Sequence, residues 1–301
     1  MSEIQTSEPV PFCLYDPRRG DLSFKLAPLG EGDFAQPQRS NCFTMLWIRR
    51  GSGFVHADLG RFEFHGPVLA FFNPYQICFL ERAGRLDGLA LQFHANFFCI
   101  ETYHEAVGCN GVLFNDTYGL PTVAVDQAQA EEFEDLFAKM TRELGGGGLA
   151  QPEMLISYLK IFLIEATRLK LAQRENSPSS APSGQSPKLE QLSQLIEAHF
   201  HDKRSPRDYA ALLHMTPKAL GKLVKTHWGR TLTEVIRERL LKQAKWQLLH
   251  TQRPVKEIAW EAGFADEFYF SRVFKRATGL APTAFREFET SIRSGGNSSM
   301  Q

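Results

Sequence analysis

The sequence contains little of what would mark a secreted or membrane protein. Its 301 residues include five cysteines, an odd number, and no two of them form a CxxC pair. A long stretch without a charged residue, 66–80, is interrupted by Pro67, Asn73 and Pro74 and is too short to span a bilayer. The first twelve residues have neither the basic start nor the apolar core of a secretory signal. These absences predict a cytoplasmic protein with reduced thiols and no membrane partner.

The chain also lacks a net charge, because 34 Lys and Arg residues balance 34 Asp and Glu residues. Over the whole chain this balance argues against a nucleic-acid or membrane-surface protein. The balance is uneven along the chain, however. Residues 188–301 hold 19 basic and 12 acidic side chains, a net charge of +7, which leaves −7 for residues 1–187. The sequence therefore predicts an acidic half joined to a basic half.

A segment of Ser, Pro and Gly separates these halves. Residues 176–187 (NSPSSAPSGQSP) contain almost nothing that could be buried, as is typical of a flexible linker. We therefore expect a first domain over 1–175, a linker over 176–187, a second domain over 188–290 and a disordered tail over 291–301.

The first half has the pattern of antiparallel β-structure followed by two helices. Short apolar runs separated by Gly, Pro and Asp predict strands at 43–49, 61–65, 68–73, 77–81 and 88–94. Apolar residues then recur every three or four positions over 126–144, and residues 153–172 are apolar nearly all round. A helix of the latter kind either packs in a core or pairs with another subunit, and the pattern leaves both open.

The second half has helical periodicity throughout, with two candidate helix-turn-helix units. In the first unit, Thr216 and Pro217 form the cap and first turn of the second helix. A set of four apolar residues forms the predicted core of this unit. That set is Ala210, Leu213, Leu220 and Leu223. In the second, Gly263 occupies the turn, with Phe270 and Phe274 in the core. A long helix over 232–249 joins the two units.

The second unit resembles a known family. The sequence IAWEAGFADEFYFSRVFKRATGLAP (258–282) has the spacing GF–x5–FSR–x–FKR–x2–G–x2–P and resembles the paired helix-turn-helix domain of the AraC/XylS transcriptional regulators. The first unit is similar more loosely, with His214 in place of a Gly and Val224 in place of a Phe. The resemblance covers 188–290 and implies two recognition helices that enter successive major grooves of one DNA site.

The resemblance also implies which residues contact DNA. The base-contacting positions fall on three residues in each recognition helix: Lys218, Gly221, Lys222, Glu267, Phe268 and Arg272. Phosphate contacts that position the domain fall on Lys225, Lys275 and Arg276. Gly221 has no side chain for a base, whereas Lys218 or Lys222 suits guanine O6 and N7 and Glu267 suits cytosine N4. The alternative interpretation is a solvated helix surface, with Arg272 bracing the protein internally.

The first half resembles the cupin-like sensor domain of such regulators, through residues 46–74 and the two helices. In the family this barrel binds a small effector and the helices dimerise. The resemblance implies an α+β protein, with a cupin-like antiparallel β-barrel and two helices followed by an all-α domain. The 17 Phe residues of this half would suit an apolar or aromatic effector, but no residue identifies the pocket.

Metal and cofactor chemistry have little support. His56, His65 and His94 lack the HxH spacing of metal-dependent cupins, and His199 and His201 have that spacing in the basic half. We therefore expect no metal, no cofactor and no catalytic residue.

The combined prediction is a cytoplasmic, sequence-specific transcriptional regulator. Its expected partners are double-stranded promoter DNA, a small-molecule effector, a second copy of the chain and, if it is an activator, RNA polymerase. Two alternatives stay open: a constitutive DNA-binding regulator whose barrel only dimerises, and a cupin-type enzyme with a helical accessory domain.

Overall fold

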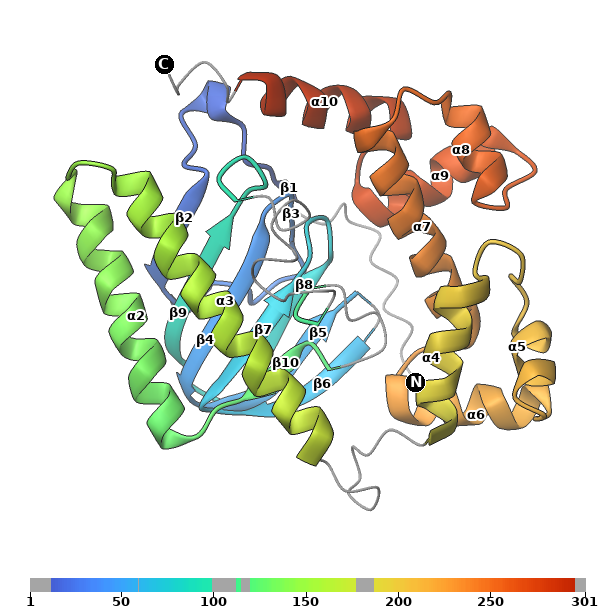
Figure 1. Ribbon diagram of the computed structural model, residues 1–301, viewed down its shortest axis with the longest axis horizontal. Helices are drawn as coiled ribbons and strands as arrows, with labels where there is room; N and C mark the ends of the chain where they lie inside the picture. Colours follow the sequence, from blue (N-terminus) through green and yellow to red (C-terminus); the bar gives the residue numbers. More distant parts are fainter. Residues whose placement is uncertain (1–11, 59, 99–111, 115–119, 177–186, 296–301) are drawn as a thin grey trace. The chain divides into compact units, whose positions relative to one another are not determined.

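The computed structural model describes residues 12–58, 60–98, 112–114, 120–176 and 187–295 (Figure 1). These residues divide into two compact units, the first ending at Arg174 and the second beginning at Glu175. The predicted linker adjoins this division, and its residues 177–186 lie outside the described residues. Each unit has a hydrophobic core of its own.

The strands of the first unit form three sheets. Their bounds are β1 Phe12–Cys13, β2 Phe24–Pro28, β3 Arg39–Ser40, β4 Phe43–Arg50, β5 Ser52–Ala57, β6 Gly60–His65, β7 Val68–Phe72, β8 Cys78–Arg82, β9 Asp87–Phe93 and β10 Thr122–Ala124. Strands β1 and β3 pair in parallel. The other two sheets have the orders β10-β7-β4-β9-β2 and β6-β5-β8, and all their pairs are antiparallel. All five strands predicted from the apolar runs are present, within a few residues at each end.

The five-stranded sheet is the middle layer of the first unit. Strand β7 is buried along its whole length because both of its faces are covered. Val68, Ala70 and Phe72 belong to the core shared with the three-stranded sheet, whereas Leu69 and Phe71 belong to the core shared with two helices. This explains why the sequence is continuously apolar here, since only a strand with one solvated face alternates.

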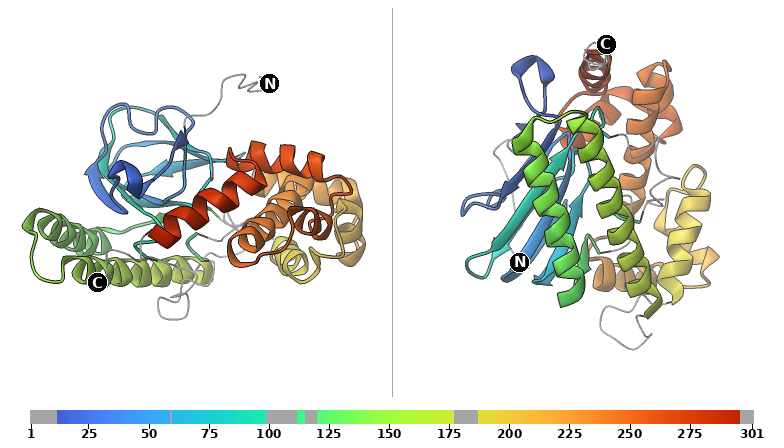
Figure 2. Two further views of the ribbon diagram at one scale, coloured as in Figure 1. Left: turned by 90° about the horizontal axis from the view of Figure 1, so that it is seen from above. Right: turned by 60° about the vertical axis from the view of Figure 1, so that its left-hand side comes forward.

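Two helices cover the outer face of the five-stranded sheet (Figures 1 and 2). Helix α2 (Gln127–Gly146) begins at a capping box formed by Asp126 and Gln129 and ends at Gly147, whose φ is 56°. Helix α3 (Gln151–Asn176) follows after a short turn. Both helices confirm the predictions over 126–144 and 153–172.

The α+β class is confirmed, but the described strands do not close into one barrel. The two larger sheets face each other across a core that includes Leu46, Val55, Phe64 and Leu80. Strand β8 pairs with β5 in its own sheet. Outside that sheet, the described residues give it a single β-bridge, between Cys78 and Gln38. Barrel closure needs a continuous ladder of backbone hydrogen bonds, and the described strands form a layered sandwich instead.

The second unit is entirely helical among its described residues. Its helices are α4 Pro187–His199, α5 Pro206–Leu212, α6 Pro217–Trp228, α7 Leu232–His250, α8 Val255–Glu261, α9 Glu267–Thr278 and α10 Pro282–Gly295. Helix α7 confirms the long helix expected over 232–249, and its residues Ile236, Leu240, Ala244 and Leu248, four positions apart, form one buried face. No helix of the described ranges is both long enough and apolar enough to cross a membrane.

Helix α10 runs further than the sequence predicts. We expected a disordered tail from residue 291, but the helix continues to Gly295. The predicted start of the tail at residue 291 is wrong, because the side chain of Ile292 is buried. Phe285 lies two turns earlier on the same buried face of the helix. Residues 296–301 lie outside the described residues.

Candidate nucleic-acid interface

The second unit contains two helix-turn-helix pairs of the same build. Helices α5 and α8 have seven residues each, and α6 and α9 have twelve each. Thr216 caps α6 through a hydrogen bond from Ala219 N, and Asp266 caps α9 by accepting from the backbone of Phe268 and Tyr269. Both second helices end at a glycine with positive φ. The two pairs therefore repeat one structure with an offset of 50 residues in the second helix.

The tight turn of each pair needs a left-handed residue. Gly263 has φ 83° and His214 has φ 52°. At Gly263 a Cβ atom would come 2.4 Å from the Arg204 guanidinium, so a glycine suits that turn. His214 adopts the same conformation despite its side chain, which is unfavourable for a residue other than glycine. The turn of the first pair therefore forms with His214 in the position where the family has a Gly.

The predicted core of the two pairs is buried with one exception. Ala210, Leu213 and Leu220 are buried, and so are Ile258, Ala259, Phe270 and Phe274. Leu223 is only half-buried, and the buried position is that of Val224 beside it. The prediction for Leu223 as a core residue is corrected because Val224 lies one turn from Leu220 and continues its stripe.

Helix α5 is anchored by a buried tyrosine. Tyr209 is fully buried and its hydroxyl donates to the Lys203 carbonyl oxygen at 2.7 Å. Burial raises the pKa of Tyr209 to about 12, because the phenolate would lose its hydration. This contact fixes the start of the first pair relative to the loop after α4.

The residues predicted to contact DNA lie at the surface of α6 and α9. All of them are exposed apart from Gly221, which is half-buried: Lys218, Lys222, Lys225, Glu267, Phe268, Arg272, Lys275 and Arg276. Lys218, Lys222 and Lys225 follow each other at four- and three-residue steps, so they share one face of α6. The structure thus brings each predicted set together on its own recognition helix.

The lysines of α6 differ from several arginines of the same unit in their ion pairing among the described residues. Within the described ranges, Lys218, Lys222 and Lys225 form no ion pair, and their charges face solvent. Several arginines elsewhere in the unit do pair internally, as Arg230 does with Glu238 and Arg239 with Glu197. Arg272 has no acidic partner among the described residues, and its guanidinium carbon lies 5.8 Å from the Tyr269 ring centre. Both α6 and α9 therefore carry exposed cations that have no acidic partner among the described residues: Lys218, Lys222 and Lys225 on α6 and Arg272 on α9.

The repeat adds a residue that the sequence interpretation missed. With an offset of 50, Gly221 of α6 corresponds to Ser271 of α9, and Lys218 corresponds to Phe268. Ser271 is half-buried and carries a hydroxyl at a position where α6 has no side chain. Aligning the two halves of the domain would have found it.

The first unit contains a second candidate site, a narrow cavity between its two larger sheets. Its lining residues are all uncharged: Phe34, Gln38, Ser40, Cys42, Thr44, Phe72, Asn73, Gln76, Cys78 and Gln92. The Gln92 amide donates to the Thr44 hydroxyl at 3.1 Å, so part of this wall is already hydrogen-bonded. The space has room for about one water molecule. The cavity is more polar than the Phe content of this half led us to expect.

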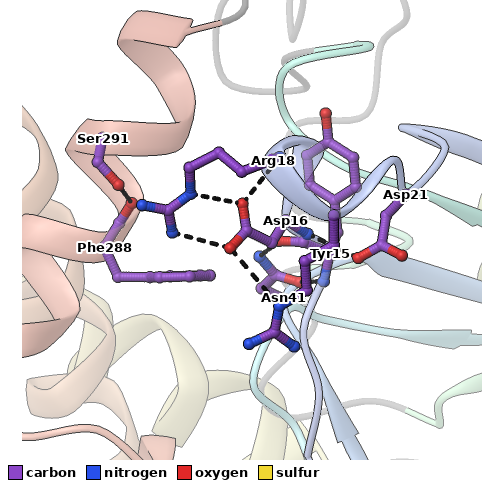
Figure 3. A network of polar contacts seen from close by, with 8 residues as sticks. Tyr15, Asp16, Arg18, Asp21, Asn41, Phe288 and Ser291 are labelled. Carbon is purple, nitrogen blue, oxygen red and sulfur yellow. Dashed lines mark hydrogen bonds and ion pairs between the residues drawn. The ribbon is translucent and has the colours of Figure 1, made fainter.

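The N-terminal segment is tied to the wall of this cavity (Figure 3). Tyr15 N donates to Asn41 Oδ1 at 2.7 Å, and Asn41 Nδ2 donates back to the Tyr15 carbonyl oxygen at 3.2 Å. The guanidinium of Arg18 donates to both carboxylate oxygens of the buried Asp16, which lowers the pKa of that carboxyl. Because Asn41 lies between the lining residues Ser40 and Cys42, these hydrogen bonds join the segment directly to the wall of the cavity.

Metal-binding clusters are not seen. Among the described residues, no group of three or more His, Cys, Asp and Glu side chains is placed to hold a metal ion. His201, one of the HxH pair, lies against the ring of Phe200 with ring centres 3.8 Å apart.

The chain is similar to several known proteins. A family profile described as a helix-turn-helix domain matches residues 209–287. The arabinose operon regulatory protein of Escherichia coli is 27% identical over 187 residues, which cover 61% of this chain and 60% of that protein. The transcriptional activator RhaS of Salmonella arizonae is 26% identical over 250 residues, 76% of this chain and 84% of that one. The solved structure of ToxT from Vibrio cholerae is 15% identical, with a TM-score of 0.39, over 88% of this chain and 98% of that chain.

These relatives are transcriptional regulators rather than enzymes. This chain spans under two thirds of the length of the arabinose regulator. The matched profile covers both helix-turn-helix pairs, from Tyr209 in α5 to Glu287 in α10. The second unit therefore contains a helix-turn-helix domain, and the chain is similar in sequence to the arabinose operon regulatory protein and to RhaS, regulators of the AraC/XylS type.

Proposed function

We propose that the protein regulates transcription by binding a specific double-stranded promoter site through α6 and α9. The observation that carries this proposal is the repeat of two recognition helices, each capped alike and each with exposed cationic side chains on one face. The basic half has a net charge of +7, which favours association with the phosphate backbone. Such a regulator works where the DNA is, which supports a cytoplasmic location.

In this proposal the nine predicted residues divide into two roles. Lys218, Lys222 and Arg272 contact base edges, and Gly221, Glu267 and Phe268 lie beside them on the same two helices. Lys225, Lys275 and Arg276 contact phosphates and set the register of the domain on the duplex. Helix α7 joins the two pairs, so that both recognition helices meet one site.

Selection from a random duplex library tests this function. The full chain is expected to enrich one sequence with two half-sites, whose centres lie about 10 base pairs apart. Footprinting on that sequence should protect two neighbouring major-groove segments on one side of the duplex. Enrichment of no sequence, or of a single short half-site, would contradict the proposal.

We also propose that a small-molecule effector binds in the cavity of the first unit. The lining offers amide, hydroxyl and thiol groups with two aromatic rings and no charge, which favours a neutral, hydrogen-bonding effector over a carboxylate. Since the cavity is narrow, binding would widen it and move the wall that holds Asn41. A thermal-shift panel of neutral polyols and matched carboxylic acids tests this, and stabilisation by the acids alone would contradict it.

A homodimer is the third part of the proposal. Met154 and Ile161 lie two turns apart on α3 and expose 40% and 46% of their surfaces, and Leu171 further along exposes 40%. Apolar side chains on the outer face of a helix that already packs on the sheet suit a second copy of the chain. RNA polymerase is a partner in this proposal if the bound protein activates transcription.

A further inference from the structure

The first turn of α9 carries an exposed aromatic side chain, Phe268, for which the described residues provide no partner. Phe268 exposes 80% of its surface, although the helix that bears it is clearly amphipathic. It makes no ring contact within the described residues. Its neighbour Tyr269 is supported on one side by Phe264, with ring centres 5.8 Å apart, and faces the Arg272 guanidinium on the other. Phe268 lacks such ring contacts among the described residues and exposes 80% of its surface, against 46% for Tyr269.

The position of Phe268 is well defined despite this exposure. The carboxylate of Asp266 accepts from Phe268 N at 2.9 Å and from Tyr269 N at 3.2 Å, which fixes the backbone of the first turn. Two residues further on, Phe270 is fully buried and anchors the same turn to the core. The phenyl ring therefore projects from a rigid part of the helix.

The equivalent position in α6 is a lysine. Lys218 is the second residue of α6 and Phe268 is the second residue of α9, and both are exposed. In helix-turn-helix proteins the N-terminal residues of the second helix meet the base edges in the major groove. The two recognition helices thus present a cation and an apolar ring at the same structural position.

Only one standard base offers an apolar group in the major groove. Thymine carries a C5-methyl group there, whereas guanine offers the O6 and N7 acceptors that suit a lysine. On the basis of the proposed function, we propose that Phe268 contacts a thymine methyl group in the half-site bound by α9. Lys218 contacts guanine in the other half-site, so the operator is asymmetric. The exposed ring of Phe268 is then buried on binding.

Uracil substitution tests this contact, because uracil differs from thymine only by the missing methyl group. Each thymine of the duplex selected by the full chain is replaced in turn by deoxyuridine, and the dissociation constant is measured by fluorescence anisotropy. One replacement, within the half-site protected by α9, is expected to weaken binding about fourfold, the equivalent of about 0.8 kcal/mol for one methyl group. With Phe268→Ala, the thymine and uracil duplexes are expected to bind equally at that position.

Two further variants serve as controls. Trp260 exposes 73% of its surface on α8, outside the recognition helix, so Trp260→Ala should keep the full response to uracil. Phe268→Leu keeps an apolar side chain and should keep part of that response. Circular dichroism of each variant confirms that it is folded.

The outcomes separate this inference from the function on which it rests. If no duplex is selected at all, the proposed function fails. If a site is bound but no uracil duplex is weakened, or if Phe268→Ala keeps the same fourfold loss, the thymine contact is wrong. If Phe268→Ala binds the selected site like the wild type but loses transcriptional output, Phe268 contacts a protein partner and the inference is also overturned.

Discussion

At the scale of single residues, we propose two different roles for the exposed cations of α6 and α9. A side chain that contacts a base edge discriminates one sequence from another, whereas a side chain on a phosphate adds affinity for every sequence. Lys222 and Arg272 occupy equivalent positions in the two helices, and both are exposed. Lys225 and Lys275 form a second equivalent pair one turn later. The equivalence predicts equal behaviour within each pair.

Alanine variants test this division. Lys222→Ala and Arg272→Ala should each cost about 1–3 kcal/mol on the selected duplex and much less on a scrambled duplex. Lys225→Ala and Lys275→Ala should weaken both duplexes alike and lower the slope of log affinity against log salt by about 1 each. Anisotropy titrations at several salt concentrations measure both quantities. Equal losses on both duplexes for Lys222→Ala would assign it to a phosphate instead.

At the scale of elements, the turns decide how well each helix pair forms. The left-handed backbone conformation is less favourable in free energy for His214 than for Gly263, because it disfavours any residue with a Cβ atom. His214→Gly is therefore expected to raise the free energy of unfolding by about 0.5–1 kcal/mol. Gly263→Ala should lower it by about 1 kcal/mol or more, since its Cβ atom would also meet the Arg204 side chain. Urea unfolding, followed by tryptophan fluorescence, measures the free energy of unfolding of each variant and of the wild type.

Helix α7 gives a second prediction at this scale, through pH. Burial lowers the pKa of Lys242 to about 8 from 10.5. The fold therefore disfavours the protonated amine, and this penalty is complete below pH 8 and disappears as the pH rises towards 10.5. The contribution of Lys242 should make the chain about 1 kcal/mol more stable at pH 9 than at pH 7.

Lys242→Met is the matched test of that pH dependence. Methionine keeps an unbranched chain without the charge, so the variant should be more stable than the wild type at pH 7 and should lose the rise between pH 7 and pH 9. A variant that is less stable than the wild type at pH 7 would show that the ammonium group is stabilised where it lies.

Elements could be predicted from the sequence where local patterns determine them. The cap at Thr216, the turn at Gly263 and the apolar periodicity over 126–144 all depend on residues a few positions apart. The pairing of distant strands is different, because it depends on which faces become covered, and the separate sheets could not be derived from runs of apolar residues. The same holds for Leu223, whose burial depends on the rotation of α6 against its neighbours.

The candidate site shows the same limit. The positions of the recognition residues followed from the resemblance and the spacing around Phe270, Arg272 and Phe274. The chemistry at Phe268 did not, because a phenylalanine in a sequence is more often buried than exposed. Its 80% exposure became informative only in the structure.

At the scale of the whole molecule, each unit contributes a different surface. The first unit, with a net charge of −7 over residues 1–187, exposes the apolar side chains Met154, Ile161 and Leu171 on α3, and the second exposes the basic side chains of α6 and α9. If α3 joins two copies, each dimer carries four recognition helices and gains affinity by binding two sites at once.

The dimer prediction has a matched pair of variants. Ile161→Glu places a charge on the exposed face of α3 and should convert a dimer to a monomer in size-exclusion chromatography with light scattering. Leu22→Glu makes the same kind of change at a leucine that exposes 73% of its surface outside α3, and should leave the dimer unchanged. A monomeric wild-type chain, or equal effects of both variants, would contradict this interface.

The most direct test of the account is the salt dependence of DNA binding by the full chain. Lys225, Lys275 and Arg276 are three proposed phosphate contacts, and each should contribute about 0.9 to the slope of log affinity against log salt. We therefore expect tight binding of the selected duplex and a slope of about −2.7 or steeper. Binding that is absent, or that does not change with salt, would contradict it.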